Sequence, residues 1–270
     1  MKYSETAPHN RMQLSFLYAV PIGLLGGLIG LGGAEFRLPV LAGPLNYSAR
    51  LAIPLNLAVS LVTLGAAFLT RSRTLSYDPI APFLPGILAL IVGAVVAAFF
   101  GPALAGKFSD ELLERVILAL LVAIGLALIV EGFLPQQTPA LLPASPIWRI
   151  SAGLLLGLAI GLISSLLGVA GGELIIPTLV FAFGADVKTA GTASLLISLP
   201  TVLVGVVRYA SHGAFERPAL VETVAPMSLG SVIGAVAGGM LVGLIPAASL
   251  KIILGLILNI SAFRIFYKAR

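Results

Sequence analysis

The chain has 270 residues, of which 59% are hydrophobic and only 10% are charged, and its mean hydropathy is +1.08. Soluble domains carry about 25% charged residues, so the lipid bilayer must be the solvent for most of this chain. The net charge of +5 comes from cations at the ends of apolar runs rather than in a basic stripe, which argues against a nucleic-acid partner. The absence of cysteine excludes disulfides and thiolate metal sites.

The apolar runs predict an all-α, polytopic membrane protein. They are long and continuous, whereas a membrane β-barrel would need short strands of alternating polarity. The first run lacks a small-residue cleavage site, so we expect it to be retained as a span. A crossing needs about 20 apolar residues. Eight runs approach that length: 14–31, 49–70, 80–101, 112–134, 150–168, 189–207, 219–244 and 250–266.

One segment of the chain occurs twice. Residues 30–41 read GLGGAEFRLPVL and residues 168–179 read GVAGGELIIPTL, at a constant offset of 138. Shorter apolar runs, 36–45 and 174–184, follow the two copies. A helix of about ten residues is about 15 Å long, which is half of a hydrocarbon core. The sequence therefore predicts two half-helices, or re-entrant segments, beside about eight transmembrane helices, and two internal repeats.

The predicted organisation is one integral domain with two lobes. It comprises a cytoplasmic N-terminal tail (1–12), a first transmembrane repeat (13–134), a linker containing Pro and Gln (135–147) and a second transmembrane repeat (148–270). Counting Lys and Arg at the span ends places 10 of the 16 inside when both termini are cytoplasmic. That count is the same whether or not the short runs cross the membrane. Parallel and inverted repeats therefore both remain open, although length favours short runs that do not cross.

Each copy of the segment carries one carboxylate, Glu35 in the first and Glu173 in the second. A carboxylate at membrane depth costs several kcal/mol unless it is paired, protonated or close to water. The two residues are therefore candidates for proton coupling or gating. Alternatively, each caps the half-helix that follows it, where the positive helix N-terminus favours a negative charge.

Glycines and polar side chains around the two copies predict a substrate site. Glycine permits an unwound backbone, whose free N–H groups together with a half-helix N-terminus can hold an anion. Polar side chains recur three and four residues apart on the following helix, where hydroxyl and amide groups can donate to anion oxygens. The alternatives are close helix packing through small residues and hydrogen bonds between helices. The candidate substrate-binding residues are Gly32, Gly33, Asn56, Ser60, Gly171, Gly172, Thr192 and Ser194.

Four cations flank the repeated segments: Arg37, Arg50, Lys188 and Arg208. They are candidates for drawing an anion toward the entrance of the site by raising its local concentration. The alternative for each is that the side chain extends to the lipid headgroups without a further role.

The segments GLGGAEFRLP and GVAGGELIIP resemble those of the sulfite exporter TauE/SafE family of integral membrane proteins. The continuation KTAGTASL at 188–195 and the basic position Arg50 add to the resemblance, which covers the chain after about residue 12. It implies a bacterial inner-membrane permease, without a tightly bound cofactor, for small sulfur-containing anions such as sulfite, sulfoacetate and other organosulfonates, or for small carboxylates. Ala34 stands where the family often has glycine, so the two half-sites are expected to be unequal.

The main functional hypothesis is a secondary transporter that works by alternating access around a midplane site at the repeat interface. An anion channel that uses the same site as a filter is the alternative. We expect no enzyme activity and no metal, because both histidines, His9 and His212, lie near polar ends of apolar runs. The expected partners are the anion and the lipid bilayer. A coupled proton and a second copy in a homodimer remain open.

Overall fold

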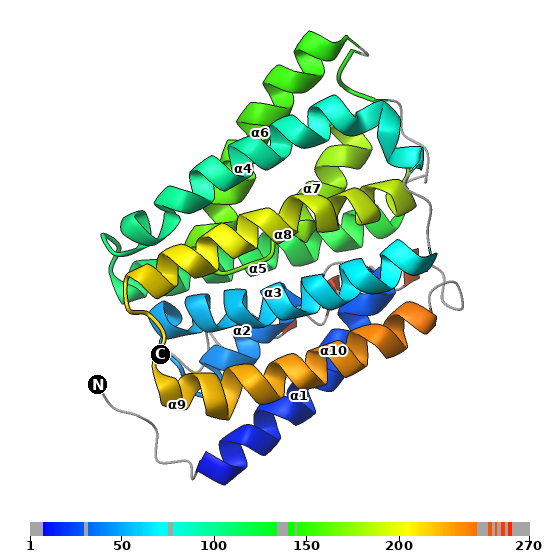
Figure 1. Ribbon diagram of the computed structural model, residues 1–270. Helices are drawn as coiled ribbons and strands as arrows, with labels where there is room; N and C mark the ends of the chain where they lie inside the picture. The colour runs from blue at the N-terminus through cyan, green and yellow to red at the C-terminus, as the bar shows by residue number, and fades with distance from the viewer. Residues whose placement is uncertain are drawn as a thin grey trace.

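The computed structural model describes residues 8–29, 32–74, 78–133, 140–143, 145–241, 248–249, 252, 255–256 and 259–260. All regular secondary structure in these ranges is helical, which confirms the predicted all-α class, and most of the long helices lie side by side (Figure 1). The elements are α1 (Pro8–Ile29), α2 (Ala34–Ala42), α3 (Ala49–Thr74), η1 (Asp78–Phe83), α4 (Leu84–Ala105), α5 (Asp110–Phe133), α6 (Pro146–Leu167), α7 (Gly172–Pro177), η2 (Thr178–Ala182), α8 (Val187–Ser211), α9 (Arg217–Ala219), η3 (Leu220–Val224) and α10 (Ala225–Met240).

Five helical segments within the described residues are long and apolar enough to cross a membrane: 49–70, 78–105, 146–167, 189–211 and 217–240. They coincide with five of the eight predicted spans. The predicted spans 14–31 and 112–134 also form helices, α1 and α5. The run 250–266 lies largely outside the described residues, so the total of eight stays a prediction.

The two short apolar runs form short helices, as expected. α2 has 9 residues, and α7 continues through the π-helical turn η2. Each follows a long helix, α1 or α6, after a break at the repeated segment.

Side-chain contacts show that α1, α3 and α10 begin at the same end of the helix bundle. Arg11 of α1 lies 3.7 Å from the Glu222 carboxylate, and its guanidinium lies 5.4 Å from the centre of the Tyr47 ring. The Tyr47 hydroxyl is 2.8 Å from that of Thr223, just before α10. We call this the first end. Because α3 begins where α1 began, α2 must return the chain to the first end, and α1 and α2 form a hairpin.

The opposite end, called the second end, holds the beginnings of α4 and α6. Arg149 of α6 donates to the Pro82 carbonyl at 3.3 Å, and its guanidinium lies 5.7 Å from the Phe83 ring centre. The Leu141 N–H donates to the Phe181 carbonyl of η2 at 2.9 Å. α6, α7 and η2 therefore form a second hairpin that enters from the second end. Segment length favoured short runs that do not cross the membrane, so that the chain would stay on the side that the preceding long helix reached. In the structure, each short run instead returns the chain to the end from which that long helix started.

Small residues allow two pairs of long helices to pack closely. Gly23 and Gly27 of α1 lie against Ser231 and Ala235 of α10, and a methyl group on either glycine would overlap backbone atoms of α10. In the same way, Gly157 and Gly161 of α6 lie against α4, at Leu90 and Ala94. Helices in membranes commonly associate through such small residues, because close backbone approach supplies the van der Waals contact that holds them together.

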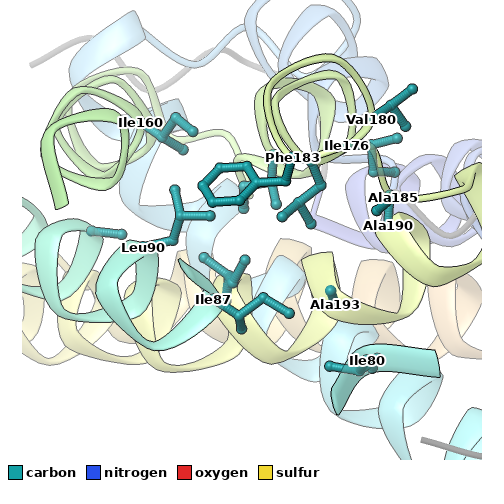
Figure 2. Packing of buried hydrophobic residues seen from close by; sticks show 14 residues of the cluster. Ile80, Ile87, Leu90, Ile160, Ile176, Val180, Phe183, Ala185, Ala190 and Ala193 are labelled. Carbon is teal, nitrogen blue, oxygen red and sulfur yellow. The ribbon is translucent and has the colours of Figure 1, made fainter. Parts of the chain in front are cut away.

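A buried apolar cluster fixes the second hairpin against α4 and α8. Figure 2 shows the ring of Phe183, at the end of η2, pointing toward Leu90 of α4 and Ile160 of α6. Gly86 of α4 leaves room for this ring, because a methyl group there would overlap it. On the other side, Ile176 packs in the same cluster as Ala193 and its neighbours on α8. This packing sets the position of α7 and therefore of the second repeated segment.

Candidate functional site

Glycine conformation explains why the helix breaks at each copy of the repeated segment. Gly32 and Gly33 have φ of +80° and +71°, and Gly168 and Gly171 have φ of +70° and +82°. This left-handed region costs a residue with a Cβ about 1–2 kcal/mol, whereas glycine adopts it freely. The turn at Gly33 is also tight, because a methyl group there would lie 3.0 Å from the Ile22 carbonyl oxygen. The two breaks are the tips of the two hairpins.

One side chain connects the two tips. The amide Nδ2 of Asn56, which is fully buried in α3, donates to the Ala34 carbonyl and to the Gly168 carbonyl, each at 2.7 Å. Ala34 belongs to the first copy and Gly168 to the second. Segments 138 residues apart in the sequence therefore meet at a single amide. The sequence predicts Asn56 as a substrate ligand, but no local pattern indicates this bridge.

Arg37 occupies the interior beside Asn56, which corrects the expectation that it lies at an entrance. Its side chain is fully buried. Nε donates to Asn56 Oδ1 at 3.0 Å, Nη2 donates to Ser60 Oγ at 2.6 Å, and Nη1 donates to the Gly32 carbonyl at 2.8 Å. A longer contact of 3.4 Å joins Nη1 to Ser231 Oγ of α10. The physical reason is the hairpin: α2 returns alongside α3, so Arg37 faces polar groups of the interior instead of the lipid headgroups.

All hydrogen-bond acceptors described for the Arg37 guanidinium are neutral. The two ion pairs found among the described residues join other side chains, Arg11 with Glu222 and Arg50 with Asp110. A buried cation without a close counter-ion is costly. Glu35 and Glu173 act electrostatically on this cation but form no ion pair with it among the described residues, so its N–H groups have no charged acceptor to give up to an anion.

Glu35 and Glu173 stand in the first turns of α2 and α7 and are 0% and 5% exposed. No donor within the described part of the chain reaches any of their four carboxyl oxygens. Neither helix start has a side-chain capping hydrogen bond, and the residues at the cap positions are Gly33 and Gly171. Their position in the first turns leaves the other interpretation from sequence, a negative charge that stabilises the positive N-terminus of each short helix, open beside proton coupling or gating. The two carboxyl groups interact electrostatically with each other and with Arg37.

The hydroxyl groups near the site donate within their own helices. Ser60 Oγ donates to the Asn56 carbonyl at 2.7 Å and Ser194 Oγ to the Gly191 carbonyl at 2.9 Å. Ser60 Oγ also accepts from Arg37 of α2, so the alternative of hydrogen bonds between helices applies to Asn56 and Ser60 of this polar face. Thr192 is buried in α8, which packs against α7, and Gly172 is buried at the start of α7. Ser198 Oγ is buried without a described partner, and the sequence-based set of substrate ligands omitted it.

The other predicted entrance charges lie away from the tips. Arg50 is half-exposed at the first end and donates to Asp110 Oδ1 at 2.8 Å and to the Phe108 carbonyl at 2.7 Å. Arg208 donates to the Phe99 carbonyl at 3.1 Å, and its guanidinium lies 4.1 Å from the Phe99 ring centre. The side chain of Lys188 lies outside the described residues. Within the part of the chain that the structure describes, no group of three or more acidic or histidine side chains is placed to hold a metal ion.

The fold and the buried cluster define a multispanning helical membrane protein with a polar centre formed by two hairpin tips. The chain belongs to the sulfite exporter TauE/SafE family of membrane transporters, whose sequence profile matches residues 14–265. This confirms the resemblance seen in the repeated segments.

Two curated relatives are similar over most of the chain. The probable membrane transporter protein YdhB of Bacillus subtilis (strain 168) is 25% identical over 232 residues, which cover 85% of this chain and 90% of that protein. The probable membrane transporter protein MamO of Magnetospirillum gryphiswaldense is 24% identical over 269 residues, covering 87% of this chain but 42% of that longer protein. No solved structure matches the chain.

Proposed function

We propose that the protein is a secondary transporter, an exporter or permease, for small sulfur-containing anions such as sulfite and organosulfonates, including sulfoacetate. The observation that carries this proposal is the buried guanidinium of Arg37, which has neutral acceptors and lies where the two hairpin tips meet at Asn56. The planar fork of a guanidinium suits oxyanions, because two N–H groups can donate to two oxygens at once. The description of the family as sulfite exporters supports this class of substrate.

We further propose that the two halves are inverted structural repeats. Residues of α1 and α6 correspond at an offset of 134, and those of α4 and α10 at an offset of 141. With these offsets the contact of Gly23 with Ser231 corresponds to that of Gly157 with Leu90, and equivalent pairs recur one turn further on. The hairpins enter from opposite ends, and α3 and α8 lie side by side in opposite directions (Figure 1). These relationships are those expected for a two-fold axis in the membrane plane.

The distribution of cations supports a cytoplasmic first end and a bacterial inner-membrane location. By position along the chain, the described cations near the first end are Arg11, Arg50, Lys107, Arg115, Arg208 and Arg217. Those near the second end are Arg71, Arg73, Arg149 and Lys188. Because Arg37 is buried, it no longer counts among the cations on the non-cytoplasmic side, and the excess of cations at the first end becomes larger. Cytoplasmic ends of membrane proteins carry the excess of Lys and Arg, so the first end and the start of α1 are assigned to the cytoplasm. A cytoplasmic C-terminus further requires the predicted span 250–266.

In the proposed mechanism, the anion binds where the tips meet, and the two halves move so that this point opens to one side and then to the other. Binding requires that Arg37 exchange some of its neutral acceptors, Asn56 Oδ1 and Ser60 Oγ among them, for anion oxygens. Backbone N–H groups at the starts of α2 and α7 add donors, because the first turn of a helix leaves N–H groups unpaired. Glu35 and Glu173 are positioned to couple this exchange to protons or to gate it.

A screen of small anions against the purified protein tests the proposed substrate class, because a ligand that binds only the folded state raises the apparent melting temperature. Sulfite and methanesulfonate are expected to raise it, and phosphate and nitrate are not. Stabilisation by small carboxylates alone would instead favour a carboxylate transporter. Single-channel currents far above transporter turnover would favour an anion channel. Absence of stabilisation by every anion would contradict the proposal.

A further inference from the structure

Apolar side chains lie between the buried Arg37 and the first end of the bundle. On α2, which returns to the first end, Leu41 follows Arg37 by one turn, and residues four apart share one face of a helix. On α3, which begins at the first end, Ala52 precedes Asn56 by one turn. Leu41 and Ala52 are both buried in the same apolar cluster. Each of the two helices that meet at the guanidinium therefore carries an apolar residue on its first-end side.

The contacts of α1 with α10 fix how these two helices are aligned. Gly23 lies against Ser231, whose hydroxyl contacts the Arg37 guanidinium, and Gly27 lies against Ala235. The offset is 208 residues in both contacts, so the two helices run in parallel and in register. The level of Arg37 on α1 and α10 is thus the level of Gly23 and Ser231.

One turn from that level toward the first end, the same register places Ala19 beside Met227. Both side chains are fully buried and belong to the same apolar cluster as Leu41 and Ala52. A turn of four residues is about 6 Å long, so four helices supply apolar side chains at one depth. We call these four residues the apolar layer: Ala19, Leu41, Ala52 and Met227.

A second group of polar side chains lies on the outer side of the apolar layer, at the first end. The Tyr47 hydroxyl is 2.8 Å from that of Thr223, and Arg11 lies 3.7 Å from the Glu222 carboxylate. Ser15, one turn before the layer on α1, is buried, and its hydroxyl has no partner among the described residues. An anion that passes between this group and Arg37 must cross side chains that offer no hydrogen bond. Apolar constrictions of this kind block ions because a charge that leaves its polar partners is costly.

Met227 is the member of the apolar layer that can move most easily. The two alanines have no side-chain rotamers, whereas methionine has three rotatable bonds and adapts to irregular spaces. At the proposed offset of 141, the second half has Gly86 in the place of Met227, and the ring of Phe183 fills the space there (Figure 2). Each end of the bundle thus fills this place with one large side chain, and at the first end that side chain belongs to the long helix itself.

We propose that the apolar layer is a gate on the first-end side of the Arg37 site and that Met227 is its movable part. The structure shows this gate closed, because all four members are at most 1% exposed. Rotation of the Met227 side chain opens a way from the outer polar group to Arg37 without separating α1 from α10. The role as a gate rests on the proposed transport function, whereas the barrier itself does not.

A single cysteine beside Arg37 tests the barrier without any transport measurement. The chain has no cysteine, so Ser231→Cys supplies one thiol, and in lipid nanodiscs both ends of the protein face water. The probe is sulfonatoethyl methanethiosulfonate, a monovalent sulfonate that modifies thiols. Met227→Ala and Leu41→Ala should each speed the modification by about tenfold or more, because the rate follows the fraction of time for which the layer is open. Met240→Ala, 78% exposed on the same helix, is the matched control and should leave the rate unchanged.

The second variant keeps this test decisive if Met227→Ala does not fold. Unchanged modification in every variant that folds would overturn the layer as a barrier, and acceleration in Leu41→Ala alone would overturn the role of Met227. Ser211→Cys, at an exposed position, gives the rate of an open thiol. Modification of Ser231→Cys at that rate in the otherwise wild-type chain would overturn the closed gate.

Met227→Ile tests the movement, since it keeps an apolar side chain in the layer but stiffens it. A β-branched residue in a helix holds one strongly preferred χ1 rotamer. Modification of the reporter cysteine should stay slow, while uptake of radiolabelled methanesulfonate into proteoliposomes should fall several-fold. Met240→Ile should take up the anion as wild type does. Wild-type uptake in Met227→Ile would overturn Met227 as the movable part. If the thiol test succeeds but wild type takes up no anion, the proposed transport function fails while the barrier stands.

Discussion

Arg37 and Asn56 hold each other in the centre of the protein. Nε of Arg37 donates to Oδ1 of Asn56 at 3.0 Å, while Nδ2 of the same amide donates to backbone carbonyls of both repeated segments. Both side chains are fully buried. The amide therefore orients the cation of the first segment and ties it to the tip of the second, so movement of either hairpin must alter the surroundings of the cation.

Asn56→Ala is expected to destabilise the protein strongly. It leaves the Arg37 Nε and the carbonyls of Ala34 and Gly168 without this partner, and each buried polar group left unpaired costs about 1–3 kcal/mol. Denaturant unfolding followed by circular dichroism measures the change. Ser211→Ala is the control, since its exposed hydroxyl contacts only the nearby Arg208 carbonyl and the His212 ring, and its loss should be almost neutral. Equal effects for the two variants would contradict the bridging role of Asn56.

Arg37→Lys is expected to weaken anion binding although it keeps the positive charge. An ammonium group lacks the planar fork, and loss of one charge-assisted hydrogen bond corresponds to about a tenfold or greater loss of affinity. Titration of methanesulfonate in the thermal-shift assay gives this ratio. Arg217→Lys, at an exposed position at the start of α9, should bind as wild type does. Unchanged affinity in Arg37→Lys would remove the guanidinium from the binding site.

Gly161→Ala is expected to loosen the packing of α6 on α4. The added methyl group would overlap the Ala94 carbonyl oxygen, and overpacking of this kind costs about 1–3 kcal/mol. Gly65→Ala in α3 is the matched control, because nothing lies within 4 Å of a methyl group there. That control should gain stability, by up to about 1 kcal/mol, from the higher helix propensity of alanine. The comparison requires only unfolding curves, and a stabilised Gly161→Ala variant would contradict the described helix contact.

Single cysteines introduced at the two ends of the bundle test the proposed topology. The chain has no cysteine of its own, so labelling has no background. A membrane-impermeant maleimide added to intact cells should label Leu141→Cys, which is 80% exposed at the second end. Ser48→Cys at the first end should react only after permeabilisation. The reverse pattern would place the first end outside and contradict the proposed cytoplasmic orientation, whereas labelling of both positions from the same side would contradict the placement of the starts of α3 and α6 at opposite ends.

The helical class, the two breaks and the two short helices follow from the sequence, because apolar runs and glycine-rich interruptions are local signals. The interior position of Arg37 does not. A cation just after an apolar run is usually at a membrane surface, and only the return of α2 beside α3 brings this one inside. Ser231 gives no sequence signal either, because its contact with Arg37 depends on α10 packing along α1.

In the proposed inverted arrangement, the correspondence of the two halves differs from the one read along the sequence. The repeated segments align at an offset of 138, but the glycines that pack α1 and α6 correspond at 134. The second hairpin is therefore about one helical turn longer between its packing glycines and its glutamate. The contacts of the packing glycines show this difference in hairpin length, whereas an alignment of the two glycine-rich breaks alone does not show it.

Uptake of radiolabelled sulfite into proteoliposomes tests the central claim most directly. The assay is best run at alkaline pH, where sulfite does not cross the bilayer as neutral sulfur dioxide. Wild type should give saturable uptake well above protein-free liposomes, Arg37→Gln should reduce it to that background, and Arg217→Gln should leave it unchanged. Uptake in Arg37→Gln equal to that of wild type, or wild-type uptake no faster than that of empty liposomes, would contradict transport of this anion through the buried Arg37 site.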